Sequence, residues 1–300
     1  MRKDIYESPL SSRYASEYML HLFSPDMRFQ TWRRLWVALA RAEHELGLPI
    51  TQEQVDELAA HITDIDYEVA EKREHEVRHD VMAHVYAYGK AAPSAAGIIH
   101  LGATSCYVGD NTDIIIMRDA LEIVRRKMIN VLANLSRFAL EYKAMPALAY
   151  THLQPAQLTT VGKRATLWMN ELLMDFNELE YRIANLKLLG SKGTTGTQAS
   201  FMELFKGDTD KVKELETKIA KEMGFDYFCT TLSISPLKDT QKINAIGQSV
   251  GEQYGVAWLP SDFKKQERYK RSIALSREYG LYRQNFCGCV YSKQEKEKPV

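Results

Sequence analysis

Three short segments carry the residues of this 300-residue chain that could do acid–base chemistry. They are residues 78–80 (Arg-His-Asp), residues 100–105 (His-Leu-Gly-Ala-Thr-Ser) and residues 151–157 (Thr-His-Leu-Gln-Pro-Ala-Gln). Imidazole groups transfer protons near neutral pH, whereas guanidinium, hydroxyl and amide groups hold anionic oxygens. Because these segments interrupt a largely helical, apolar pattern, we interpret them as parts of one site for an anionic substrate.

Each segment also has a purely structural interpretation. His152 stands at the start of a long helix, where a capping turn uses such polar residues. Residues 100–113 would then be a capped turn that binds no ligand. If the helix around residue 79 is continuous, successive side chains point about 100° apart, and Arg78 and Asp80 would be surface charges. A fourth polar loop, residues 191–200, adds donors but lacks the spacing of a phosphate-binding P-loop.

Apolar residues at helical spacing predict the elements that position these segments. Residues 24–46 form a first helix, residues from 51 onward form a second with a Thr–Gln capping box, and residues 66 to about 90 form a third. Residues 91–111 are rich in Ala, Gly, Ser and Thr, and they predict an ordered loop between two periodic helices.

Two much longer helices follow. Apolar residues step by three or four from Met117 to Phe138, in a helix of about 28 residues that would span roughly 40 Å. The same stepping recurs from Ala165 to Leu186. Both helices exceed the usual length of about a dozen residues. We therefore predict a bundle of long helices that buries apolar seams between subunits. Strand signals are almost absent as far as residue 220.

The pattern changes near residue 224. Residues 225–232 are aromatic and β-branched, like a buried strand, residues 240–254 predict a helix and residues 256–260 a second strand, followed by a helix at residues 268–279. This alternation is typical of an α/β sheet. The predicted fold is mainly α, a long-helix bundle followed by a small α/β segment, in three parts: residues 1–110, 111–224 and 225–300.

Composition excludes some classes of partner. The chain has 39 basic and 39 acidic residues, so bulk charge gives no attraction to nucleic acid or to an anionic membrane. No run approaches the roughly 18 apolar residues of a membrane span, and the charged first residues lack a signal-peptide core. We expect a cytoplasmic protein with reduced cysteines. The pair Cys287 and Cys289 is the exception, because such a pair can ligate a soft metal or an iron–sulfur cluster.

Residues 1 to about 224 resemble the adenylosuccinate lyase family of the fumarase/aspartase superfamily. The resemblance implies a truncated bundle of the fumarase/aspartase type. It also implies a homotetramer with active sites composed from three subunits, a purine nucleotide substrate and no cofactor. The implied reaction is β-elimination of fumarate from adenylosuccinate, or from succinylated carboxamide ribotide, in purine nucleotide biosynthesis. The matching segments are residues 8–16, 78–84, 97–105, 151–157 and 192–200.

The same resemblance implies a role for each site residue. His152 would be the general acid that protonates the leaving nitrogen, and His79 would support substrate binding or proton transfer beside it. The family's base is a serine on a Ser-Ser-x-Met-Pro-x-Lys-x-Asn-Pro loop, and this sequence contains no such segment. We therefore expect elimination to be lost or severely reduced. The residues expected to hold the substrate are Arg13, Tyr14, Arg78, Asp80, Thr104, Ser105, Thr151 and Gln198.

Residues from about 225 resemble the C-terminal half of the QueH-type epoxyqueuosine reductases of tRNA queuosine synthesis. The resemblance implies an iron–sulfur cluster ligated by Cys287 and Cys289, but it also requires an N-terminal paired-cysteine motif that this chain lacks. The chain is then a fusion of two incomplete enzymes. Two alternatives remain: a reductase fragment, with tRNA as partner only if this tail functions, and a non-catalytic fusion product that pairs with a full-length lyase. The matching segments are residues 225–228, 230–236, 259–265, 269–272 and 279–289.

Overall fold

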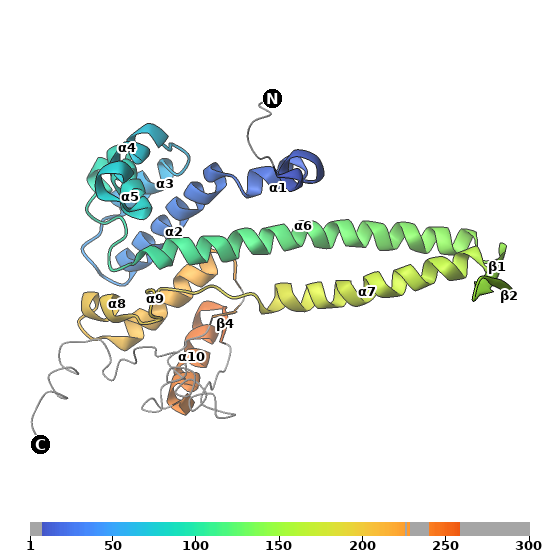
Figure 1. Ribbon diagram of the computed structural model, residues 1–300. Helices are drawn as coiled ribbons and strands as arrows, with labels where there is room; N and C mark the ends of the chain where they lie inside the picture. The colour runs from blue at the N-terminus through green and yellow to red at the C-terminus, as the bar shows by residue number, and fades with distance from the viewer. Residues whose placement is uncertain (1–7, 226, 229–239, 259–300) are drawn as a thin grey trace, which may run out of the picture. The chain divides into compact units, whose positions relative to one another are not determined.

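The computed structural model describes residues 8–225, 227–228 and 240–258 (Figure 1). The chain divides into two compact units. Unit 1 comprises Met1–Phe23 and Ile114–Leu186, and unit 2 comprises Ser24–Asp113 and Lys187–Val300. Helices make up most of the described residues, which confirms the mainly α fold. None of these helices is both long enough and apolar enough to cross a membrane.

Unit 1 is built on two long helices that run side by side, α6 (Ser105–Glu141), of which the residues from Ile114 belong here, and α7 (Val161–Asn185) (Figure 1). An ion pair between Arg125 and Glu180 links them. They also approach closely at Gly162, because a Cβ there would lie 2.3 Å from the carbonyl oxygen of Ala139. The short elements η1 (Leu10–Tyr14) and α1 (Glu17–Leu22) also belong to this unit.

The long helices are confirmed, but the first of them begins earlier than expected. It starts at Ser105 and has 37 residues, so residues 105–111 are helical rather than part of a loop. The reason is tertiary: Asn111 is fully buried, and its side-chain amide donates to the carbonyls of Tyr107 and Gly190 at 2.7 and 3.0 Å. A polar side chain satisfied in this way stabilises helix where composition alone suggests loop.

A β-hairpin joins the two long helices, contrary to the expected absence of strands before residue 220. Strand β1 (Pro146–Thr151) pairs antiparallel with β2 (Gln154–Thr160). His152 and Leu153 form the two-residue turn, and both have positive φ angles, 48° and 63°. Two-residue hairpin turns with positive φ at both positions match the twist of the strands, but they usually contain Asn or Gly. The His-Leu sequence therefore does not predict such a turn. His152 therefore lies at a hairpin tip, not at a helix start.

Unit 2 packs its helices around an aromatic core. Its N-terminal part contains α2 (Pro25–Glu45), α3 (Gln52–Ala60), α4 (Tyr67–Val77), α5 (Asp80–Ala91) and η2 (Pro93–Ala95). Two expected caps are confirmed, because Ser24 accepts a hydrogen bond from the Met27 amide and Thr51 forms a capping box. The largest fully buried side chains of this part are Trp32, Trp36, Arg33, Tyr88, Tyr107, Leu35, Leu39 and Leu58.

The single helix predicted for residues 66–90 is wrong. The chain breaks at Arg78, which has the left-handed φ of 56° and ends α4, and at His79, which caps α5. A left-handed conformation costs a non-glycine residue roughly 1–2 kcal/mol, so tertiary packing must hold it in place. α4 and α5 indeed pack on each other. Residues 78–80 therefore form a corner between two helices, and the argument that their side chains diverge around one helix no longer applies.

The C-terminal part of unit 2 contains α8 (Ala199–Leu204), α9 (Thr209–Glu222), β3 (Tyr227–Phe228), α10 (Thr240–Tyr254) and β4 (Ala257–Trp258). Strands β3 and β4 are parallel with α10 between them in sequence, as the expected β–α–β order requires. α9 packs against both α2 and α10. The helix predicted at residues 268–279 and the cysteines 229, 287 and 289 lie outside the described residues.

Candidate functional site

Two polar loops that are almost a hundred residues apart in sequence meet in unit 2. The Ser200 hydroxyl donates to the carbonyl of Gly102 at 2.6 Å, and the Cys106 thiol lies 3.0 Å from the Thr194 hydroxyl. Gly193 lies so close to Thr104 that a Cβ would come within 3.3 Å of its methyl group. The structure thus brings residues 100–106 and 193–200 onto one surface, as expected for parts of one site.

His100 lies at the start of the first of these segments and bonds to α2. Its backbone is left-handed, with φ of 68°, and its Nδ1 atom accepts a hydrogen bond of 2.9 Å from Trp36 Nε1. Burial, with the charge of His79 as a smaller cause, lowers the pKa of His100 to about 4. His100 is therefore neutral at neutral pH, and His79 lies near enough to influence it.

His79 caps the start of α5 and is exposed to solvent. Its Nδ1 atom accepts from the Met82 amide at 3.4 Å and lies 3.7 Å from an oxygen of Asp80. That oxygen in turn accepts from the Val81 amide at 2.7 Å. The cap and an Nδ1–H···Asp80 ion pair need opposite protonation of the same nitrogen, and the shorter cap contact fits the neutral ring. The N-terminus of α5 carries partial positive charge that favours a bound anion.

The loop at residues 191–200 is stabilised by hydrogen bonds within it and by an ion pair with α9. Gln198 Nε2 donates to the Ser191 hydroxyl at 3.1 Å, and the Gly193 amide donates to the Thr197 carbonyl at 2.9 Å. Lys192 is buried and forms an ion pair with Glu216 of α9. A buried ion pair fixes the geometry of the backbone that carries it, because separating the two charges is costly. These bonds fix the backbone of the loop, whose Gly193 lies against Thr104.

The residues expected from sequence divide between the two units. In unit 2 the loops around residues 104 and 198 meet. In unit 1, Arg13 lies over the ring of Tyr14 at 5.6 Å and His152 occupies the exposed hairpin tip. Unit 2 holds Arg78, His79, Asp80, Thr104, Ser105 and Gln198; unit 1 holds Arg13, Tyr14, Thr151 and His152.

The sequence does not predict the hydrogen bond between Trp36 and His100. His100 was singled out in its segment but given no role, and Trp36 was assigned only to an apolar helix face. No local signal links them, because 64 residues separate the two. Among the described residues no group of three or more His, Cys, Asp or Glu side chains could hold a metal ion. Thr104 Oγ1 is buried there without a hydrogen-bond partner.

Comparison with known proteins gives two separate matches. The lyase family matches residues 15–224, and the family described as epoxyqueuosine reductase QueH matches residues 212–295. Adenylosuccinate lyase of Schizosaccharomyces pombe is 55% identical over 224 residues, which cover 74% of this chain and 46% of that protein. Epoxyqueuosine reductase QueH of Streptococcus pyogenes serotype M1 is 52% identical over 73 residues, 24% of this chain and 29% of that protein.

The chain thus spans about half the length of the adenylosuccinate lyases it matches. Among solved structures, the 3-carboxy-cis,cis-muconate lactonizing enzyme from Pseudomonas putida matches with a TM-score of 0.62 at 24% identity, over 71% of this chain and 48% of that one. At this identity the structural match supports the fold alone. Both comparisons place the polar loops of unit 2 within the region that is shared with lyases.

Proposed function

This chain belongs to the lyase family, and from that premise we propose that it binds adenylosuccinate, or succinylated carboxamide ribotide, but does not by itself complete the elimination of fumarate. The observation that carries the proposal is the meeting of residues 100–106 with residues 193–200 beside His79. These loops are the segments that resemble the substrate-binding segments of adenylosuccinate lyases. Their contact in unit 2 supports a working binding surface.

The chemistry of that surface suits an anionic nucleotide. α5 begins at Asp80 beside His79, and α6 begins at Ser105 beside Thr104, so two helix N-termini offer amide hydrogens to one neighbourhood. Helix N-termini stabilise phosphate and carboxylate groups. Hydroxyl and amide groups of Thr104, Ser105 and Gln198 supply further hydrogen bonds. Together these groups match a substrate that carries a phosphate and a succinyl group.

Elimination needs an acid and a base as well as a binding surface. One carbon of the succinyl group bears the leaving nitrogen, and a base must remove a proton from the adjacent carbon. An acid must protonate the nitrogen as the C–N bond breaks. We propose His152 as the acid. No serine loop of the family's type occurs in this sequence, so the proton-abstracting step has no assigned residue. The substrate would be held without being cleaved.

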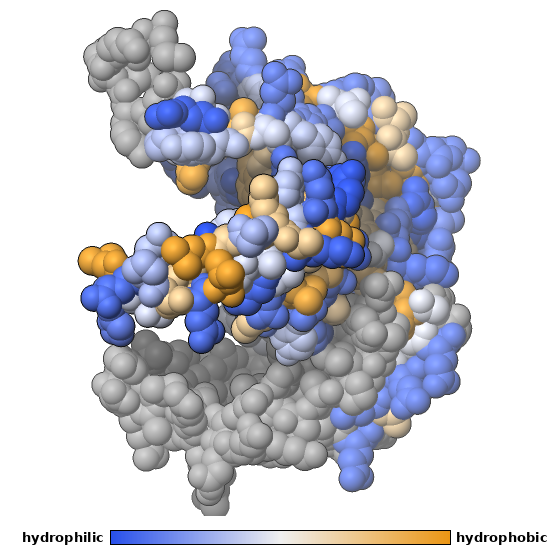
Figure 2. All heavy atoms as spheres, turned by 90° about the vertical axis from the view of Figure 1, so that its right-hand side faces the viewer, coloured by the Kyte–Doolittle hydropathy of each residue, from blue (hydrophilic) through white to orange (hydrophobic). Residues whose placement is uncertain are grey.

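We propose that His152 serves the site of another copy of the chain. It stands in a two-residue turn next to Leu153, whose side chain is 98% exposed. In Figure 2, which views the hairpin end of Figure 1, apolar side chains lie among polar ones over the foreground surface. Exposed apolar side chains that gather on one surface mark a site where another protein can bind. A site composed from several subunits, as the family resemblance implies, would use the tip in this way.

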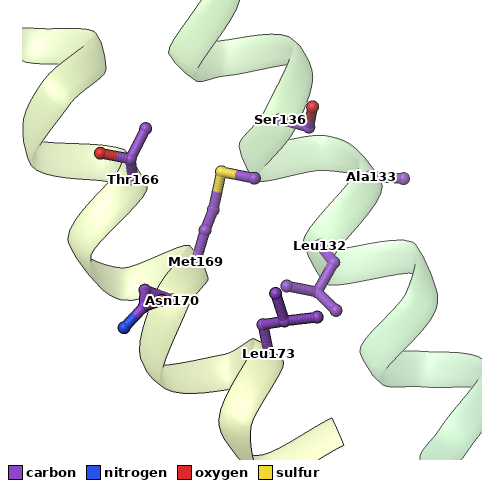
Figure 3. A pocket seen from close by; sticks show the side chains of 7 residues that line it. All are labelled: Leu132, Ala133, Ser136, Thr166, Met169, Asn170 and Leu173. Atoms are coloured by element: carbon purple, nitrogen blue, oxygen red, sulfur yellow. The ribbon is translucent and has the colours of Figure 1, made fainter. Parts of the chain in front are cut away.

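The long helices of unit 1 also support self-association. Between α6 and α7 lies a groove of about 490 Å³, in which Met169 and Leu173 face Leu132 (Figure 3). Outside the groove, Trp168 is 57% exposed and Met174 is 64% exposed. Apolar area of this extent on a helix pair is typical of a subunit interface. A second copy of the same helices is therefore the proposed occupant.

The proposal is tested with the purified full chain. Titration calorimetry with adenylosuccinate should show saturable binding, and ultraviolet absorbance should show no fumarate release above the uncatalysed rate. His79→Gln should weaken binding about tenfold, as expected for one lost hydrogen bond to a charged group. His75→Gln is the matched control, because His75 is exposed on α4 and should leave binding unchanged. Absence of binding would refute the binding function, and sustained fumarate release would refute the proposed block.

A second candidate function concerns the tail. The match to QueH over residues 212–295 and the parallel β3–α10–β4 unit favour a fragment of an epoxyqueuosine reductase. The cysteines present do not fit the family's cluster. Cys106, at the start of α6, contacts the Thr194 hydroxyl, which leaves three cysteines where an iron–sulfur cluster takes four ligands. No reductase step is therefore derived from this chain.

A further inference from the structure

The contact between Trp36 and His100 has unambiguous polarity. Trp36 Nε1 lies 2.9 Å from His100 Nδ1, and the two rings meet edge to face with their planes at 86°. An indole nitrogen carries a hydrogen and can only donate. His100 Nδ1 must therefore present its lone pair to Trp36, and the single proton of the neutral ring resides on Nε2.

Burial maintains this arrangement. Trp36 is 1% exposed, so water does not compete for its N–H group. A proton on Nδ1 would face the indole N–H directly, and desolvation already lowers the pKa of His100 to about 4. The second, smaller cause of this lowered pKa is the charge of His79. The ring is therefore neutral, with its proton on Nε2, over the physiological pH range.

From this geometry we propose that Trp36 is a positioning residue that holds His100 in the Nε2–H tautomer, so that His100 donates one hydrogen bond to an anionic oxygen of the ligand and takes no part in proton transfer. The ligand contact rests on the proposed function, whereas the tautomer does not. Within the described ranges no atom accepts a hydrogen bond from Nε2, so this donor is available. The Thr104 hydroxyl, four residues further along, is buried and has no hydrogen-bond partner among the described residues.

A hydrogen bond also selects the tautomer of the neutral His79 ring. Its Nδ1 accepts from the Met82 amide, so Nε2 carries the proton of the neutral ring there as well. His79 is exposed, however, and Asp80 stands 3.7 Å from Nδ1 and can pair with it once it is protonated. His100 has no such carboxylate at Nδ1, because that atom accepts from Trp36 Nε1.

The chain offers a matched control for the tryptophan. Trp32 lies one helical turn before Trp36 on α2 and is also 1% exposed. Its indole nitrogen has no hydrogen-bond partner among the described residues, and its ring packs edge to face against Trp36 at 6.1 Å. Trp32→Phe therefore removes a buried indole from the same core without touching the His100 hydrogen bond, whereas Trp36→Phe removes the donor itself.

The tautomer is tested by nitrogen-15 magnetic resonance of the full chain labelled at histidine, with His100→Gln identifying the His100 signals. We expect an unprotonated Nδ1 and a protonated Nε2 that persist from pH 8 to about pH 5, in the parent chain and in Trp32→Phe. In Trp36→Phe we expect a mixture of tautomers. If Trp36→Phe fails to fold, the parent chain alone decides: a protonated Nδ1, or titration of His100 near the usual histidine pKa, would overturn the inference.

The ligand contact is tested by adding adenylosuccinate. We expect the Nε2 proton of His100 to shift on binding, and Trp36→Phe to bind about tenfold more weakly while Trp32→Phe binds as the parent chain does. Binding without any change at His100 would overturn the contact. If the chain binds no nucleotide, the proposed function fails together with the contact, but the tautomer still stands or falls on the spectra of the free chain.

Discussion

Lys192 and Glu216 form an ion pair in which the side chains are only 4% and 5% exposed. The lysine also donates to the carbonyl of Leu189 at 2.8 Å, so that it ties the polar loop at residues 191–200 to α9. Helix α9 is the element that both family matches include, since one ends at residue 224 and the other begins at residue 212. The pair therefore joins the candidate site to the place where the two family resemblances overlap.

Lys192→Met should destabilise the protein by about 3–5 kcal/mol, because it leaves the Glu216 carboxylate buried without its partner. Urea unfolding followed by circular dichroism measures the loss. Lys213→Met on the same helix is the control, since the Lys213–Asp210 pair is largely exposed and should contribute less than about 1 kcal/mol. Equal effects of the two substitutions would contradict the importance of the buried pair.

Because of Glu43, we expect the free energy of unfolding to fall as pH rises. Burial raises its pKa to about 9, and neither carboxyl oxygen has a hydrogen-bond partner among the described residues. The unfolded chain releases this proton near pH 4.5 and the folded chain does so only near 9, so the folded state binds more protons between these values and loses stability as pH increases.

Glu43→Gln should therefore gain stability over the parent chain on going from pH 5 to pH 8, by about 1–3 kcal/mol. Parallel urea titrations at the two pH values measure this difference. Glu57→Gln, at a carboxylate that hydrogen bonds to Ser94 near the surface, should show no such gain. A parent chain whose stability relative to Glu43→Gln does not change with pH would show that Glu43 ionises normally.

Glycine at position 153 of the hairpin turn should make the protein more stable than the leucine that is present. Leu153 adopts a φ of 63° and contacts little, so Leu153→Gly should stabilise the chain by up to about 1 kcal/mol by relieving left-handed strain. Leu158→Gly in β2, a comparably exposed leucine of the same hairpin, should destabilise it by roughly 0.5–1 kcal/mol. Thermal unfolding of both variants compares them, and a destabilising Leu153→Gly would mean that Leu153 packs against a second copy.

Self-association should depend on the groove between the long helices. Leu173→Glu places a charge there and should shift the mass measured by light scattering toward a single chain, since burying an unpaired carboxylate is costly. Glu171→Gln, an exposed position on α7, should leave the mass unchanged. A parent chain that is already monomeric at micromolar concentration would refute the proposed second copy.

The tail should not assemble a stable iron–sulfur cluster. Anaerobic reconstitution with iron and sulfide is expected to give no persistent visible absorbance after desalting, because three cysteines remain for a cluster that takes four. A stable cluster that is lost in Cys287→Ser but kept in Cys106→Ser would instead establish a working metal site in the tail.

Helices whose signals are local could be predicted from the amino-acid sequence. The helical spacing of apolar residues and the caps at Ser24 and Thr51 were enough for α2, α3 and the two long helices, because a helix forms contacts between residues three and four apart. The polar segments could also be recognised, since their composition differs from that of the surrounding helices. The resemblance to lyases followed from those segments and is confirmed by the family match.

The backbone conformation of those segments and the contacts between them depend on tertiary packing. The left-handed corner at Arg78 and the turn at His152 use residues that rarely adopt such φ angles, so packing rather than local preference selects them. The hydrogen bond from Trp36 to His100 spans 64 residues and the Lys192–Glu216 pair spans 24. No periodic pattern encodes such pairs, because each exists only where folded elements meet and exclude water.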